Sequence, residues 1–195
     1  MIILCISATP WTKVFSHDTA GGLFTSNSDA ISKNSENPDA NLFSVLNQLE
    51  TLRLADGSFH LKICYPELGD CNEWTQTSNP ATDSTILGFK AITLGFPKNS
   101  YREAFGGLGV SPASDSTTFI DDTPNQSFWF YPIGAKVYYG SNTIPGPVSE
   151  DGTRHKVKRV DFFVETPGMS YTNMLGTVKT NKSLDCNLCH RVNRL

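Results

Sequence analysis

The stretch Phe59-His-Leu-Lys-Ile-Cys-Tyr65 alternates strictly between apolar and polar side chains. In an extended chain this period of two places the large apolar side chains on one face and His60, Lys62 and Cys64 on the other. A similar alternation returns in Val157–Glu165, and turn-forming residues separate several further short apolar runs. The sequence therefore predicts a mostly β fold, either an antiparallel β-sandwich or a jelly roll.

One packed helix is expected, over about residues 38–54. Asn37 is a good N-cap and Pro38 suits the first helical position. Apolar residues at spacings of three and four then form one face, which predicts packing against the core. These residues are Leu42, Val45, Leu46, Leu49 and Leu52. An α/β sheet would need regular helices between its strands, and the sequence does not supply them.

Composition narrows the class of protein and its partners. The 195 residues are long enough for one domain with a real core, and the charged fraction of 18% is low because turn formers take its place. The net charge of −3 leaves no global basic surface, so nucleic acid is not an expected partner. The basic run Arg154–Arg159 is interpreted as a solvated strand face. No apolar stretch approaches the ~18 residues of a transmembrane segment.

Three regions differ in character along the chain. Residues 1–10 are apolar and lead into small residues, and two interpretations stay open: a remnant of a secretory signal or a buried first strand. Residues 11–166 form one β-rich domain with a boundary near Pro167. Residues 167–195 read as a polar, basic and weakly patterned tail.

Cysteine spacing predicts one disulfide. Cys64 and Cys71 bracket a tight loop in which Pro66 and Gly69 allow the chain to turn back. A bridge across so short a loop would stabilise the fold by roughly 2–3 kcal/mol at best. Setting Cys5 aside with the signal-like segment leaves an even number of the 5 cysteines, which favours an oxidising, extracellular compartment.

Two Asn-x-Ser triplets match the acceptor pattern for N-glycosylation. They begin at Asn125 and Asn181, and they add modestly to the prediction of a secreted glycoprotein.

The segment Cys186-Asn-Leu-Cys189-His190 matches the attachment signature of c-type haem, with His190 as the iron ligand. The alternative is a C-x-x-C pair in a polar tail, either as free thiols or as a disulfide. The motif lies close to the end of the sequence in polar surroundings, which favours the alternative over haem. Zinc is disfavoured because only three ligands are clustered.

Three aromatic residues are candidates for stacking on sugar rings: Trp74, Trp129 and Tyr131. Half of any strand faces the core, so part of the aromatic set serves packing. In the run Phe128-Trp-Phe-Tyr131, Phe128 and Phe130 are expected inside, which leaves Trp129 and Tyr131 for the ligand.

Asp121 and Asp122 form a carboxylate pair at the end of a short strand. Such a pair can bind calcium through its oxygens, poise one carboxyl by repulsion, or cap a turn. The identity of any metal stays open. The sequence has no G-x-S-x-G elbow, H-E-x-x-H motif or P-loop, so a non-enzymatic protein is predicted.

Several segments together resemble a secreted, lectin-like module of marine animals and protists. They are Trp11-Thr-Lys-Val-Phe15, His17–Phe24, Cys64–Leu68, Asn72–Pro80, Ile120–Pro124 and Ile144–Pro147. The opening segment is similar to the start of fibrinogen-like and intelectin-type domains, and Val160-Asp-Phe-Phe-Val164 is similar to the last strand of a discoidin-type sandwich. The calcium loop of fibrinogen-like domains has no counterpart here, so no binding residues are carried over.

The resulting first hypothesis is an extracellular binding or adhesion domain for glycans or matrix proteins, without enzymatic activity. Its candidate surface consists of Trp74, Trp129, Tyr131, Asp121 and Asp122. The alternatives are a structural subunit of an extracellular assembly, a haem carrier using the C-terminal motif, and a hydrolase of unrecognised type. No cofactor is expected under the first hypothesis, except that calcium stays an option.

Overall fold

The computed structural model describes residues 11–112, 117–124 and 129–167, which are built around one antiparallel sheet. Its seven strands, in spatial order, are β2 (Ser32–Lys33), β3 (Leu42–Val45), β1 (Trp11–Asp18), β11 (Arg159–Glu165), β4 (Phe59–Tyr65), β5 (Asp70–Gln76) and β6 (Lys90–Leu94). All neighbouring strands run antiparallel. The predicted mostly β, antiparallel fold class is confirmed.

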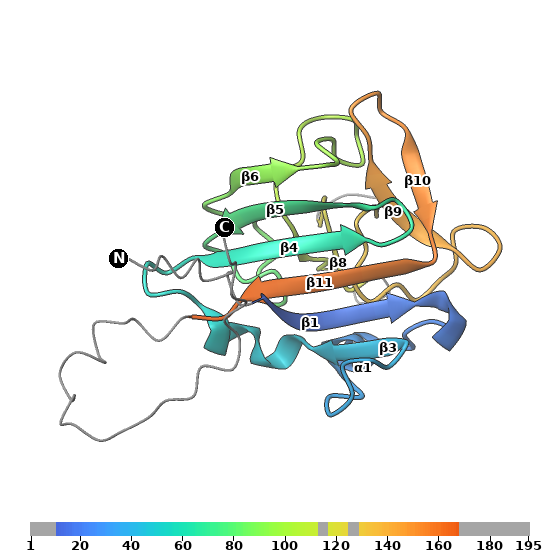
Figure 1. The fold of residues 1–195 in the computed structure, drawn as a ribbon, viewed down its shortest axis with the longest axis horizontal. Coiled ribbons are helices and arrows are strands. Elements are labelled where there is room, and N and C mark those ends of the chain that lie inside the picture. Colours follow the sequence, from blue (N-terminus) through green and yellow to red (C-terminus); the bar gives the residue numbers. More distant parts are fainter. Residues whose placement is uncertain (1–10, 113–116, 125–128, 168–195) are drawn as a thin grey trace, which may run out of the picture.

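The first and last described strands lie side by side near the middle of the sheet (Figure 1). Strand β11 pairs with β1 on one side, from Trp11↔Glu165 to Asp18↔Arg159, and with β4 on the other. The hairpins that connect β4, β5 and β6 are local in sequence. Strand β11 therefore joins this local meander to the N-terminal strands through a long-range contact.

One face of the sheet carries the core. The strand β4 alternates as predicted, since its four large apolar side chains are fully buried and the three residues between them are partly exposed. Strand β11 repeats the pattern, with Val160, Phe162 and Val164 all buried. Burial of this continuous apolar face supplies the main driving force for folding.

A less regular layer covers this inner face. It contains two short ribbons, β7 (Gly109–Val110) with β8 (Ile120–Asp121) and β9 (Ile144–Val148) with β10 (Arg154–Val157). In Figure 1 the sheet is seen nearly face on, with β8 and its loops behind it.

Two buried amides on β5 attach the sheet to this covering layer. The Asn72 amide donates to the Phe96 carbonyl at 2.7 Å and accepts from the Phe96 N–H at 2.8 Å. Gln76 makes the same double contact with Leu108, at 2.9 and 3.2 Å. Each amide therefore mimics a strand partner and satisfies loop backbone groups that would otherwise be buried without hydrogen bonds.

The helix expected over residues 38–54 is shorter than predicted. Residues Leu42–Val45 form strand β3, and a 3₁₀ helix, η2 (Leu46–Leu52), follows it directly. Strand pairing wins in the first part because β3 lies between β1 and β2, where its backbone groups find partners. The predicted burial holds nonetheless, since Leu46 and Leu49 are buried and Leu52 packs against the core.

Two other short helical segments lie beside β1 and β3. The 3₁₀ turn η1 (Thr19–Gly21) follows β1, and α1 (Asn27–Ile31) precedes β2. The Ser26 hydroxyl caps α1 by accepting a hydrogen bond from the Asp29 N–H at 3.1 Å. Among the described residues, no helix has the length and apolar character that a membrane crossing requires.

Candidate functional site

Trp74 lies on the inner face of β5 and is fully buried, so the prediction that it stacks on a ligand is wrong. Its ring packs against Phe105 and Phe162, with centroids 5.2 and 6.2 Å away. Its indole N–H donates to the Gln76 side-chain oxygen at 2.8 Å. Both the apolar body and the polar tip of the indole are therefore used by the core.

Tyr131 is also fully buried, which contradicts its predicted place on the binding surface. Its hydroxyl donates to the Lys98 carbonyl at 2.6 Å and accepts from the Val148 N–H at 3.1 Å. The residue has a φ of 53°, in the left-handed region, which is incompatible with a continuous strand. Because the strand pattern fails here, both Phe130 and Tyr131 point inward, whereas the sequence predicted them on opposite faces.

Trp129 is the one member of the predicted aromatic set that stays partly exposed. Its ring meets Tyr139 edge to face at 6.3 Å. The structure does not bring Trp129 together with Trp74 or Tyr131 on a common surface, since the other two lie in the core. Phe128, which was expected inside, lies outside the described residues.

Asp121 and Asp122 are buried rather than exposed, with 2% and 5% of their surface accessible. Asp121 accepts a hydrogen bond from the Thr123 N–H at 2.8 Å, and Asp122 accepts two from the N–H and hydroxyl of Ser100. Burial raises the pKa of Asp121 to about 8 and the pKa of Asp122 to about 6. The pair therefore anchors loops and does not form an open binding surface.

Calcium binding stays a prediction. In the ranges that the structure describes, no group of three or more His, Cys, Asp or Glu side chains is arranged to hold a metal ion. The haem motif, Cys186, Cys189 and His190, lies outside the described residues, as do both glycosylation acceptors, Asn125 and Asn181.

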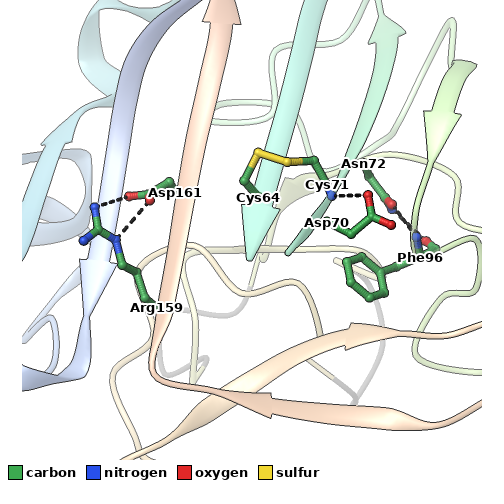
Figure 2. The surroundings of a disulfide bond; sticks show 7 residues. All are labelled: Cys64, Asp70, Cys71, Asn72, Phe96, Arg159 and Asp161. Atoms are coloured by element: carbon green, nitrogen blue, oxygen red, sulfur yellow. Dashed lines mark hydrogen bonds and ion pairs between the residues drawn. A yellow bond between two sulfur atoms is a disulfide. The ribbon is translucent and has the colours of Figure 1, made fainter. Parts of the chain in front are cut away.

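The predicted disulfide between Cys64 and Cys71 is present. The two residues face each other across β4 and β5, with their Cα atoms 4.1 Å apart, and Figure 2 shows the bridge crossing between the strand ends. Asn72, the next residue on β5, makes its inward hydrogen bond to Phe96 in the same view. Because successive side chains alternate between faces, the disulfide lies on the outer face of the sheet.

The outer face gathers residues from four adjacent strands. Strand pairing places Trp11 opposite Glu165, Phe163 opposite Lys62, Lys62 opposite Glu73, and Cys64 opposite Cys71. These side chains are all partly exposed, whereas most of the side chains that alternate with them along the strands are buried in the core. We call this surface the open-face site: Trp11, His60, Lys62, Cys64, Cys71, Glu73, Phe163 and Glu165.

A shallow hollow of about 180 Å³ lies at the centre of the open-face site. Two rings, one ammonium group and the disulfide line it: Trp11, Phe163, Lys62, Cys64 and Cys71. The lining is mostly apolar, and Lys62 is its one charged residue. The hollow is smaller than an enclosed pocket for a whole small ligand, so it offers a surface on which one ring can rest.

His60 holds a polar cluster beside the hollow. Its Nδ1 lies 2.5 Å from a Glu165 carboxylate oxygen, and its Nε2 lies 2.9 Å from a Glu73 oxygen. The imidazole also meets the Trp11 ring edge to face, with centroids 4.8 Å apart. Since both ring nitrogens are engaged, the imidazole fixes the two carboxylates in position and supports the indole.

The Lys62 ammonium lies 5.2 Å from the centre of the Trp11 ring, within the range of a cation–π contact.

At the far end of the outer face, Arg159 pairs with Asp161 on the same strand at 3.0 Å (Figure 2). Asp161 also accepts a hydrogen bond from Ser16 at 2.7 Å. The charges at that end are therefore satisfied within the protein.

Sequence reasoning did not select Trp11, Lys62 or Phe163 as site residues. The alternation in residues 59–65 and 159–165 was a usable signal, because it already placed Lys62 and Phe163 opposite the core side chains. That Trp11 joins them follows only from the pairing of β1 with β11, which has no local sequence signal.

Four strands supply the chemical groups of the open-face site. Its rings come from β1 and β11, its ammonium from β4, and its carboxylates from β5 and β11. Comparison with models of known protein families, with curated proteins and with solved structures finds no match for this chain.

Proposed function

We propose that this domain is a non-enzymatic extracellular binding module that binds glycans on the open-face site. The observation that carries the proposal is the grouping of two partly exposed rings, Trp11 and Phe163, in one hollow beside polar groups. The apolar face of a sugar ring packs well on an aromatic ring, while its hydroxyls need donors and acceptors at the edge. Glu73 and Glu165 offer carboxylate oxygens there.

The disulfide supports an extracellular location. Cys64 and Cys71 line the hollow, so their bridge faces the surface and meets the redox conditions of the surrounding compartment. Disulfides persist in oxidising environments and are rare in the cytosol. A glycan-binding role is consistent with such an environment.

The experiment is a glycan array probed with the full chain, produced through a secretory pathway. The variant Trp11→Ala is expected to lose about fivefold in affinity for every glycan bound, because it removes one stacking surface worth about 1 kcal/mol. Trp129→Ala is the matched control, since that indole is also partly exposed but lies on a different surface. Absence of any bound glycan, or equal losses in both variants, would contradict the proposal.

A structural subunit of an extracellular assembly is the second candidate. Strand β6 is an edge of the sheet, and Leu87 and Ile92 beside and within it are 58% and 51% exposed. Exposed edges with apolar side chains can pair with another chain, although the irregular register between β5 and β6 bends this edge. Oligomers that form with increasing concentration and disappear in Ile92→Lys would favour this candidate.

A further inference from the structure

We propose that the glycan bound at the open-face site is acidic, and that the Lys62 ammonium pairs with the carboxylate of a uronate-type sugar. This inference rests on the proposed function and specifies its ligand. It is carried by the presence of one lysine, Lys62, in the lining of a hollow whose other lining residues are apolar.

Lys62 lacks the ion-pair partner that its position on β4 offers. Cross-strand pairing places Lys62 directly opposite Glu73, where an ion pair would normally form. Glu73 instead directs its carboxylate to the His60 ring, at 2.9 Å. Within the described residues no carboxylate pairs with the Lys62 ammonium, which contacts the Trp11 ring.

His60 engages both carboxylates that lie near Lys62 on the outer face. Glu165 contacts one ring nitrogen of His60 and Glu73 the other. Both acidic groups of the site are thereby engaged by the imidazole and not by the Lys62 ammonium. An arriving anion therefore meets the ammonium without displacing an internal ion pair.

Lys62 also lies close to the rings on which a sugar would stack. Lys62 shares the lining of the hollow with both rings, so a sugar stacked on Trp11 or Phe163 brings its ring substituents within reach of the ammonium. A cation held over an indole keeps a defined location while remaining partly hydrated. One ammonium matches one negative charge per sugar, which favours a uronate over a densely sulfated chain that would also approach Glu73 and Glu165.

The test compares oligomers of galacturonate, glucuronate and mannuronate with their methyl esters, using the full chain. Esterification keeps the sugar ring, removes the charge and adds one methyl group. The acid is expected to bind about fivefold more tightly than its ester at low salt, which is the upper range for a partly exposed ion pair. This preference should shrink as salt is added.

Two lysine variants separate a specific contact from a general charge effect. Lys62→Met keeps the aliphatic stem and should remove the preference for the acid over its ester. Lys90→Met makes the same change in net charge on the exposed edge strand β6 and should preserve the preference. Equal losses in the two variants would overturn the assignment to Lys62.

The remaining outcomes distinguish this inference from the proposed function. If the wild-type chain binds neutral glycans but binds acid and ester equally, the acidic ligand is wrong while glycan binding stands. If only sulfated oligosaccharides bind, the carboxylate is wrong. If no acidic oligomer and no array glycan binds, the proposed function fails together with this inference.

Discussion

Replacing Asp121 with Asn should remove a specific part of the pH dependence of folding. Burial raises the pKa of Asp121 to about 8 in the folded protein, whereas its ordinary value is 3.8. Between these values the folded protein keeps the proton and the unfolded chain does not. Stability therefore falls as the pH rises toward 8, by about 1.4 kcal/mol per pH unit while the folded state stays protonated.

The range from pH 6.5 to 8 isolates this group best. Burial raises the pKa of Asp122 only to about 6, and burial lowers the pKa of His17 to about 4, so both have largely finished titrating in the folded protein. Integrating the slope of Asp121 up to its own midpoint gives a loss of about 1.5 kcal/mol in this range. Asp121→Asn keeps the oxygen that accepts from Thr123 but carries no proton to lose.

The assay is urea unfolding followed by tryptophan fluorescence at several pH values, without reductant. The free energy of unfolding of the wild type should decline relative to Asp121→Asn by about 1.5 kcal/mol from pH 6.5 to 8. Asp151→Asn serves as the control, because hydrogen bonds to Thr153 lower the pKa of that exposed carboxyl and it stays ionised throughout this range. Parallel curves for wild type and Asp121→Asn would refute the reasoning.

Three further predictions concern the disulfide and the packing of the core. The pair Cys64→Ala and Cys71→Ala should cost about 2–3 kcal/mol, because the unfolded chain gains freedom; urea titration should show reduced wild type matching this variant, and unequal values would count against the prediction. Gln76→Leu should cost about 3 kcal/mol by leaving a buried indole N–H and loop backbone groups unpaired, with faster hydrogen exchange in that loop as its signature. Gly134→Ala should lower Tm more than Gly57→Ala: both have positive φ, but an added Cβ lies 2.5 Å from a neighbouring alanine only at Gly134. Equal Tm losses would refute the steric argument.

The candidate site was predicted poorly because alternation defines two faces of a strand but not which face is covered. On β5 one face carries Asn72, Trp74 and Gln76, and the other carries Cys71 and Glu73. Amide side chains are usually exposed, so Asn72 and Gln76 did not mark their face of β5 as buried. Trp74, which lies between them, was therefore assigned to the surface. The amides are buried because they bond to loop backbones, and those loops lie far away in the sequence.

Local chemistry by itself determined several features of this protein. The alternation of residues 59–65 specified a strand with one buried face, and the spacing of Cys64 and Cys71 predicted their bridge. The leucine pattern predicted burial of Leu46 and Leu49, although part of that stretch became a strand. These features depend on residues close together in the chain, so their physical causes are present in the local sequence.

Only the tertiary structure decided which strands meet. Strand β11 lies between β1 and β4, and this arrangement alone brings Trp11, Phe163 and Lys62 around one hollow. The segment Ile144–Val148 forms a buried strand despite two prolines, because β10 pairs with it and the core covers it. The pairing of β11 with β1 and β4 joins segments far apart in the sequence, so it depends on the packed core as a whole and not on any local pattern.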